Sequence, residues 1–177
     1  AATGTLLTTY NGHNRNIGRY RGQAPVWALA FPPGGQVLSA GGGAWVQIWE
    51  PEKAQAEAGD AGDMEERFQT RSHARHLPHG QKGAVFALAW GGGTLYAAGE
   101  DGQAAAYDPQ TLTETRRYGT PGEWIYSLAV DPERGRLATG AYDGRVRLYD
   151  TKTGRPVADF LAAPGRATQA RRATQAR

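Results

Sequence analysis

The chain has 177 residues, 40% of them hydrophobic and 21% charged, a balance that is typical of one folded domain and excludes global disorder. Its formal net charge is only +3, and four arginines in residues 166–177 supply much of the basic excess, so a basic nucleic-acid groove on the rest of the chain is not expected. The absence of cysteine excludes a disulfide framework and a thiolate metal site, and no apolar run approaches the ~18 residues of a membrane-spanning helix.

The first predicted unit, residues 1–22, is short. Three stretches separated by turn-forming residues predict strands over 1–4, 6–10 and 17–20. They correspond to the second, third and fourth strands of the longer units described next, so we interpret this unit as a sheet that lacks its first strand.

Residues 23–73 form the second predicted unit. Its first strand begins at Val26 and ends at a turn, Pro32 to Gly35, that carries two prolines and two glycines. Its other strands are predicted over 37–40, 45–49 and 66–72. An insertion rich in Ala and Glu, residues 51–65, delays the last of them. We interpret this insertion as a solvated loop, with a short amphipathic helix that docks a partner as the alternative.

Two further units, residues 74–119 and 120–163, repeat the same order of strands and turns. In the last unit the Asp-Gly turn at Tyr142 to Arg145 lies between two apolar runs, which is the strongest short signal for a β-hairpin. Strands are predicted over 85–90, 95–98, 104–107, 114–118, 125–130, 137–141, 146–149 and 156–160. Residues 164–177 repeat Arg-Ala-Thr-Gln-Ala-Arg without an apolar stripe, and a disordered basic tail is expected there.

The three longer units are copies of one another. Their first strands begin Val26-Trp27, Val85-Phe86 and Ile125-Tyr126, and their third strands end in Trp49-Glu50, Tyr107-Asp108 and Tyr149-Asp150. Val85 and Ile125 are 40 residues apart, and a period near 40 with four short strands is typical of propeller blades. The predicted fold is therefore all-β, a propeller with about four four-stranded blades in this chain.

The segment Leu-Ala-Thr-Gly-Ala-Tyr-Asp-Gly-Arg-Val-Arg-Leu-Tyr-Asp at residues 137–150 resembles the WD40-repeat family, with Tyr-Asp in place of Trp-Asp. The resemblance covers roughly residues 1–162 and implies a β-propeller that binds proteins. It also implies structural roles for the turn residues Asp101 and Asp143 and for the aromatics Trp49, Tyr107 and Tyr149.

One family feature is missing from these repeats. Family members often carry a Gly-His pair before the first strand, whose histidine joins a Ser or Thr, the turn Asp and the aromatic in a hydrogen-bonded tetrad. The matching positions here are Arg21-Gly22, His79-Gly80 and Tyr118-Gly119. Blade stability is therefore expected to depend on packing more than on that network.

Closed propellers have about four to eight blades. With three whole blades and part of a fourth, both end blades would expose a broad apolar face, and large apolar patches are association sites. We expect further blades to complete the ring. They would come from more of the same polypeptide or, as the alternative, from a second propeller half in another protomer.

A partner-binding rim is expected where the segments before each first strand meet the turns between the second and third strands. Aromatic and charged residues on loops of a rigid scaffold are what a protein-binding surface needs. The residues predicted for this rim are Gln23, Lys82, Glu100, Glu123, Trp124 and Tyr142. The alternative for Trp124 and Tyr142 is that they cap the blade core and bind nothing.

The remaining candidates favour structural roles. His73, His76 and His79 share one face only on a helix, and Pro78 favours a loop, so no metal site is expected there. No Ser/His/Asp arrangement, Walker loop, dinucleotide fingerprint or haem-attachment motif is present in the sequence. We expect neither a cofactor nor an enzymatic activity of this chain itself.

Three functions remain open at the level of the sequence. The first is a non-catalytic scaffold that holds protein subunits in a larger assembly. The second is the accessory propeller of a larger bacterial enzyme or cytochrome-bearing protein. The third is an RNA-associated propeller that uses the arginine-rich tail, which would bind with a steep salt dependence.

Overall fold

The computed structural model describes residues 14–17, 20–23, 25–34, 36–41, 46–51, 75–76 and 83–162. These residues form three four-stranded antiparallel sheets and one two-stranded hairpin, β1 (Asn14–Ile17) with β2 (Tyr20–Gln23). No helix in the described part of the chain is long and apolar enough to cross a membrane.

Each four-stranded sheet is a meander in which neighbours in sequence pair in space. The first sheet contains β3 (Val26–Ala30), β4 (Val37–Gly41), β5 (Val46–Trp49) and β6 (Arg75–His76). The central sheet contains β7 (Val85–Gly91), β8 (Thr94–Gly99), β9 (Ala104–Tyr107) and β10 (Glu114–Tyr118). The last sheet contains β11 (Ile125–Asp131), β12 (Arg136–Ala141), β13 (Arg145–Asp150) and β14 (Pro156–Leu161).

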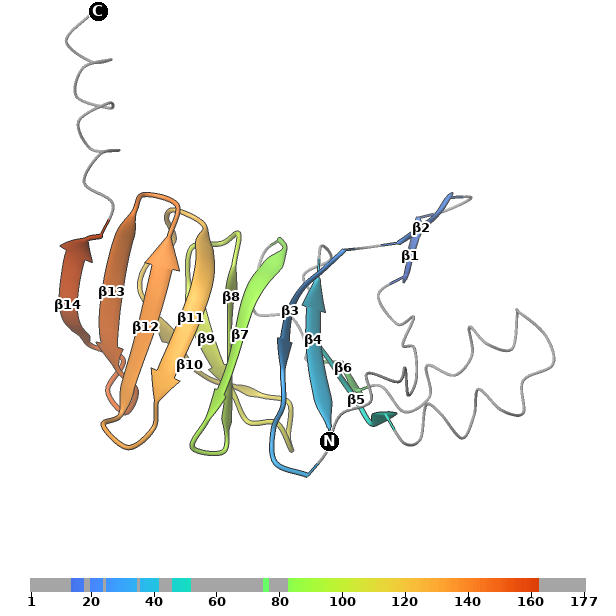
Figure 1. Cartoon of the computed structure of the whole chain (residues 1–177), viewed down its shortest axis with the longest axis horizontal. Coiled ribbons are helices and arrows are strands. Elements are labelled where there is room, and N and C mark those ends of the chain that lie inside the picture. The colour runs from blue at the N-terminus through green and yellow to red at the C-terminus, as the bar shows by residue number, and fades with distance from the viewer. Residues whose placement is uncertain are drawn as a thin grey trace, which may run out of the picture.

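The three sheets stack face to face (Figure 1). Strand β3 contacts β7, and β7 contacts β11, so the first strands of the three sheets lie side by side along one edge of the stack. This is the arrangement of propeller blades, in which the first strand of each blade lies nearest the axis. The predicted all-β propeller fold is confirmed.

The core consists of two apolar layers, one on each face of the central sheet. Leu95 and Ala97 face the first sheet, where they pack with Val46 and Ile48, whereas Tyr96 and Ala98 face the last sheet. Both faces can be buried because side chains alternate along a strand. The small side chains of β9, a run of three alanines, are buried against these layers.

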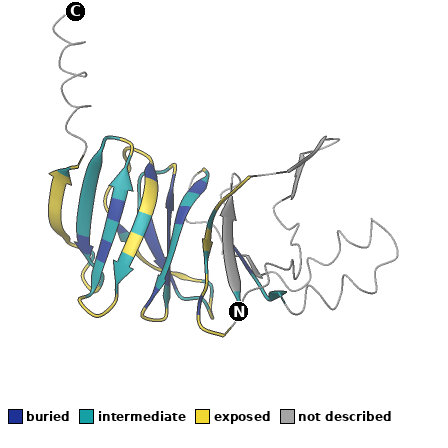
Figure 2. Cartoon of the chain, in the orientation of Figure 1, coloured by how far each residue is buried: buried dark blue, intermediate teal, exposed yellow. Residues whose placement is uncertain are grey.

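The two end sheets carry exposed strands that the central sheet lacks. Figure 2 shows the dark blue of buried residues on β8 and β9, and the yellow of exposed residues along β3 and β14. Val157 and Phe160 of β14 are large apolar side chains that solvent reaches. Among the described residues no strand covers the outer face of the last sheet, as expected for an end blade of an incomplete ring.

The structure differs from two of the strands expected from sequence. Residues 17–20 were expected to form one strand, but Ile17 and Tyr20 face each other across the β1–β2 hairpin. The fourth strand of the second unit, expected over 66–72, falls outside the described residues, and β6 at Arg75–His76 pairs with β5 instead. The predicted strands over 1–4 and 6–10, the insertion and the basic tail also lie outside the described residues.

Candidate protein-binding surface

A β-bulge recurs at the start of the first strand in all three sheets. Pairing with the second strand shifts by one residue between Val26 and Ala28, between Val85 and Ala87, and between Ile125 and Ser127. The extra residues at these bulges are Trp27, Phe86 and Tyr126. A bulge turns a side chain out of the regular alternation, so each sheet presents one aromatic ring at the same position.

These three rings touch across the sheets. The centroids of Trp27 and Phe86 are 5.9 Å apart with nearly perpendicular planes, and those of Phe86 and Tyr126 are 5.0 Å apart and stacked. Both geometries are favourable for aromatic pairs. The repeat therefore places a continuous aromatic row across the inner edges of the three blades.

Two further aromatics widen this row at the last sheet. Trp124 lies 5.8 Å from Phe86 and Tyr142 lies 6.2 Å from Tyr126, measured between ring centroids. The backbone N–H of Tyr142 donates to the carbonyl of Trp124 at 2.8 Å, which joins the turn after β12 to the segment before β11. We call Trp27, Phe86, Trp124, Tyr126 and Tyr142 the aromatic surface.

The aromatic surface is accessible in this chain. Trp27 is 56% exposed and Tyr142 is 52% exposed, and Trp124 and Tyr126 are also exposed, whereas Phe86 at the centre is half-buried. An exposed group of large rings is unusual because burying them would stabilise the fold. The structure thus provides a rigid apolar platform of the kind found in interface hot spots.

The structure brings together only some of the residues predicted for the rim. Trp124 and Tyr142 lie in the aromatic surface, and Glu123 is exposed directly before Trp124. The Glu100 carboxylate accepts the Ala84 N–H at 2.9 Å, so it fixes its own turn to the start of β7. Gln23 ends β2, far from β11 in sequence, and Lys82 lies outside the described residues.

Sequence analysis did not single out Trp27, Phe86 and Tyr126 as site residues. The available signal was the alignment of the three copies, where each has an aromatic as the second residue of its first strand. The alternation of side chains along a strand predicts which face of the sheet each residue lies on, but it does not predict a β-bulge. The sequence pattern therefore gave no reason to expect that these three side chains meet.

The turn aspartates bind backbone and arginine groups. Asp101 accepts the N–H of Gln103 at 3.1 Å, and Asp143 accepts the N–H of Arg145 at 3.0 Å, the hydrogen bonds of Asx turns. Burial acts to raise the pKa of the Asp143 carboxyl, but its hydrogen bonds from Arg147 and Arg145 outweigh burial, and the pKa is lowered.

The aromatics at the ends of the third strands occupy equivalent positions. Each of them pairs with an apolar residue near the start of the second strand of its own sheet. The pairs are Trp49 with Val37 of β4, Tyr107 with Leu95 of β8, and Tyr149 with Leu137 of β12. Burial raises the pKa of the Tyr107 hydroxyl to about 12 and also raises the pKa of Tyr149. These hydroxyls therefore stay protonated at neutral pH, and both rings belong to the core layers.

Asp108 and Asp150, which follow the third strands, have structural roles in equivalent turns. The pKa of Asp108 is lowered by backbone hydrogen bonds from Thr111 and Gln110, and that of Asp150 by those from Thr153 and Lys152, in equivalent turns. Among the described residues, no three His, Cys, Asp or Glu side chains are grouped so that they could hold a metal ion.

The comparisons with known proteins agree with this geometry. The family model "WD domain, G-beta repeat" (WD40) matches residues 4–50 and 113–150. The chain contains WD40 repeats over these residues. WD40 repeats imply a role of the interaction-scaffold kind.

Two curated relatives share parts of the chain. The "U3 small nucleolar RNA-associated protein 4 homolog" of Mus musculus is 32% identical over 84 residues, which are 47% of this chain and 12% of that protein. A "Probable cytosolic Fe-S cluster assembly factor" of Schizosaccharomyces pombe is 27% identical over 147 residues, 72% of this chain and 23% of that protein. The chain thus spans less than a quarter of the length of these relatives.

Two solved structures of computationally designed proteins share the fold. The Ika4 protein superimposes with a TM-score of 0.64 at 19% identity, over 89% of this WD40 chain and 80% of that chain. The Ika8 protein superimposes with a TM-score of 0.60 at 20% identity, over 79% of this chain and 37% of that chain.

Proposed function

We propose that this WD40 chain is a non-catalytic scaffold subunit that holds a protein partner on the aromatic surface. The observation that supports this proposal is the row of bulged aromatics, Trp27, Phe86 and Tyr126, which the fold repeats in each blade. Selection for stability alone would not favour large aromatic side chains at three equivalent surface positions, two of them exposed. A partner segment with apolar side chains would bury them.

The charged residues beside the aromatic surface would provide the polar rim of this interface. Glu123 is exposed in the loop that leads to Trp124, and Glu100 is exposed in the turn after β8. Charged groups at a rim contribute to orientation and association rate more than to affinity. In this proposal Glu123 and Glu100 orient the partner, and the aromatic side chains provide most of the binding free energy.

The test is affinity purification of the protein from its source, followed by mass spectrometry of the retained subunits. We expect a stoichiometric protein partner with the wild-type chain. Trp124→Ala should weaken its binding by about thirtyfold, the effect of losing a hot spot worth about 2 kcal/mol. The matched control is Phe31→Ala, which removes an exposed ring that follows β3.

Retention of the partner at equal strength by Trp27→Ala, Trp124→Ala and the control would contradict the proposal. Recovery of this polypeptide alone, extended into a catalytic domain, would favour the second candidate, an accessory propeller of a larger enzyme. The short span of this chain within its relatives is the observation that keeps this candidate open.

The open outer faces support a second part of the proposal, completion of the ring by further blades. Val157 and Phe160 are exposed on the last sheet, and Val26 and Leu29 on the first. These blades would come from the same polypeptide or from a second propeller half. Light scattering of the purified chain distinguishes these two sources. Only a second propeller half gives a dimer, and that dimer dissociates when the protein is diluted.

An RNA-associated role is the third candidate. Its support is the name of the mouse relative and the four arginines of residues 166–177. Binding of RNA that weakens steeply between 50 mM and 200 mM salt, and is lost on deletion of residues 164–177, would favour it. Equal binding by the truncated chain would exclude the tail as the RNA contact.

A further inference from the structure

The aromatic surface is bordered by negative charge. In the described part of the rim, the exposed charged side chains are Glu100 and Glu123, and neither forms an ion pair with a described residue. The aspartates of the same turns, Asp101 and Asp143, are instead paired with arginines. Unpaired carboxylates beside apolar rings differ from a purely apolar patch, because charges at an interface select a partner of opposite charge.

The carboxylate of Glu100 is held in a fixed position. Its Oε2 accepts the backbone N–H of Ala84 at 2.9 Å, and the backbone N–H of Glu100 donates to the Ala84 carbonyl at the same distance. A Cβ at Gly83 would collide with this carboxylate, and the φ of +99° there is one that glycine adopts easily. The second carboxylate oxygen accepts no hydrogen bond from the described residues, so it is a preorganised acceptor for a partner.

Glu100 occupies the position in the central blade that Tyr142 occupies in the last blade. Tyr142 likewise donates its backbone N–H to the residue just before a first strand, the carbonyl of Trp124, at 2.8 Å. Phe86 follows Ala84 by two residues, and its ring centroid is 5.8 Å from that of Trp124. The fixed carboxylate and the exposed indole therefore stand on adjoining blades, connected through Phe86.

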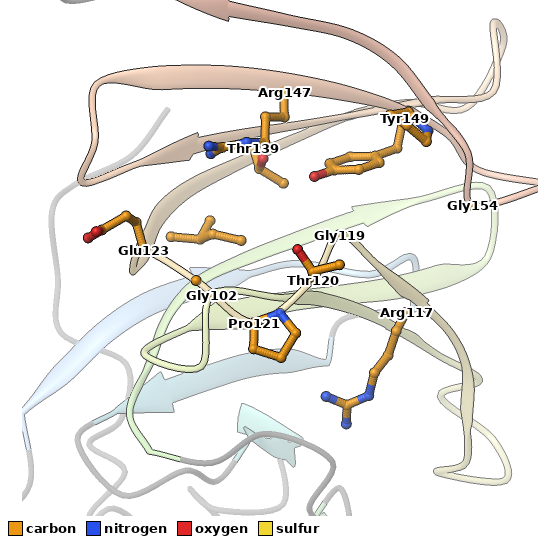
Figure 3. A pocket seen from close by; sticks show the side chains of 13 residues that line it. Gly102, Arg117, Gly119, Thr120, Pro121, Glu123, Thr139, Arg147, Tyr149 and Gly154 are labelled. Atoms are coloured by element: carbon orange, nitrogen blue, oxygen red, sulfur yellow. The ribbon is translucent and has the colours of Figure 1, made fainter. Parts of the chain in front are cut away.

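Glu123 adds a second carboxylate beside Trp124. It lines a pocket of about 430 Å³ between the central and last sheets, where Figure 3 shows its carboxylate apart from the Arg117 guanidinium. Arg117 pairs with Glu114 at 2.6 Å. The other arginine of that lining pairs with Asp143. Since both arginines are engaged elsewhere, the charge of Glu123 is available to a partner.

The packing of the rings decides how a cation can approach them. A flat group between two rings needs ring centroids about 7 Å apart, twice the contact distance of about 3.5 Å. Phe86 and Tyr126 are 5.0 Å apart, and Trp124 is 5.8 Å from the first and 6.3 Å from the second. A ligand of these three rings therefore contacts an outer face, and an indole attracts cations more strongly than the other aromatic side chains do.

From these observations we propose that the protein partner places an arginine side chain on the aromatic surface. Its guanidinium stacks on the Trp124 indole and donates a hydrogen bond to the free oxygen of Glu100, while its aliphatic stem covers Phe86. Arginine suits this surface better than lysine, because its planar group stacks on a ring and is less strongly hydrated. The inference rests on the proposed function, since it uses the same surface, and it adds the charge of the partner segment.

The test is a titration of the ¹⁵N-labelled chain with capped tripeptides, acetyl-Gly-X-Gly-amide, in which X is arginine, lysine, citrulline or leucine. Citrulline has the shape of arginine without its charge. We expect the arginine peptide to cause saturable amide shifts at residues 84–86, 100 and 124–126. The lysine peptide should bind about threefold more weakly and the citrulline peptide at least about tenfold more weakly. Raising the salt from about 50 mM to about 500 mM should weaken binding of the two cationic peptides only.

Two variants separate the carboxylate from the ring. Glu100→Gln keeps an oxygen that can accept the Ala84 N–H but removes the charge, and should weaken binding of the arginine peptide about fivefold. The matched control is Glu133→Gln, which removes an exposed carboxylate from the turn between β11 and β12, at the opposite end of the sheet. Trp124→Leu keeps an apolar side chain without a ring, and should weaken the arginine peptide about fivefold while leaving the leucine peptide unchanged.

The inference is overturned if the arginine peptide does not bind saturably, if any other peptide binds as tightly, or if Glu100→Gln binds it as the wild type does. The proposed function fails by a different result, in which the partner purified from the source is retained equally by Trp124→Ala and by its control. A partner that Trp124→Ala loses and Glu100→Gln retains at full strength would contradict the arginine inference alone and leave the proposed function standing.

Discussion

The central and last sheets have the same strand order and the same turns, yet they differ in what surrounds them. Leu95 and Leu137 occupy equivalent register positions and both are fully buried, because each faces a layer between two sheets. Phe160 of the last sheet is 52% exposed, because only one face of that sheet packs against another sheet in the described part of the chain. Position in the stack, more than local sequence, therefore decides how much each side chain stabilises the fold.

This comparison predicts its largest effect in the core of the central sheet. Leu95→Ala removes a side chain that packs against Val46 and Ile48, and we expect it to lower the free energy of unfolding by about 2–5 kcal/mol. Phe160→Ala on the open face should change it by no more than about 0.5 kcal/mol. Urea denaturation of the three proteins measures both. Equal losses would mean that the outer face of β14 is covered in solution.

Ala97 of the central sheet and Thr139 of the last sheet occupy equivalent positions, and substitutions at the two are expected to change stability in opposite directions, by less than Leu95→Ala. Ala97→Thr places a hydroxyl and a methyl group into a closed apolar layer and should cost about 1–3 kcal/mol. Thr139→Val removes a hydroxyl that has no hydrogen bond, and should leave stability unchanged or raise it by about 1 kcal/mol. Thermal unfolding compares them. A clear loss of stability in Thr139→Val would show that the hydroxyl is satisfied in the folded chain.

Tyr107→Phe is expected to have the smallest effect on stability at neutral pH, because the hydroxyl that it removes carries no charge at that pH. Burial raises the pKa of Tyr107 to about 12 from the ordinary value of 10.0. Above pH 10 the unfolded chain releases this proton while the folded chain retains it, so stability falls as the pH rises from 10 to 12. Tyr118, also raised to about 12 mainly by burial, adds to this fall.

Denaturation at pH 8, 10 and 11.5 tests this expectation. The wild-type chain should lose stability across the upper interval, and Tyr107→Phe should lose less. The exposed Tyr142→Phe variant is the control, and its curve should follow that of the wild type. Parallel curves for all three proteins would show that Tyr107 ionises at its ordinary pH, and hence that water reaches it in the central sheet.

The repeats in the sequence determined the fold to a large extent. Glu114–Tyr118 was predicted and observed as a strand with the same bounds, and most other strands of the last two sheets differ by one or two residues. This success has a local cause, because alternation and Asp-Gly turns are encoded within a few residues. The fourth strand of the first sheet was not placed, because a two-residue strand after a long insertion has no periodicity to detect.

The candidate site was predicted only in part for a related reason. Trp124 and Tyr142 stood out as aromatics in loops, which is a property of sequence. Phe86 and Tyr126 lie inside apolar strands, and only the bulges turn them toward a shared surface.

By itself, the sequence determined that this chain forms four-stranded blades of the WD40 type, since strand, turn and repeat signals act over short distances. The tertiary structure alone decided which aromatic rings meet, which sheet is buried on both faces and which hydroxyl lacks a partner. These properties depend on how neighbouring blades pack, and packing brings together residues that no local pattern connects.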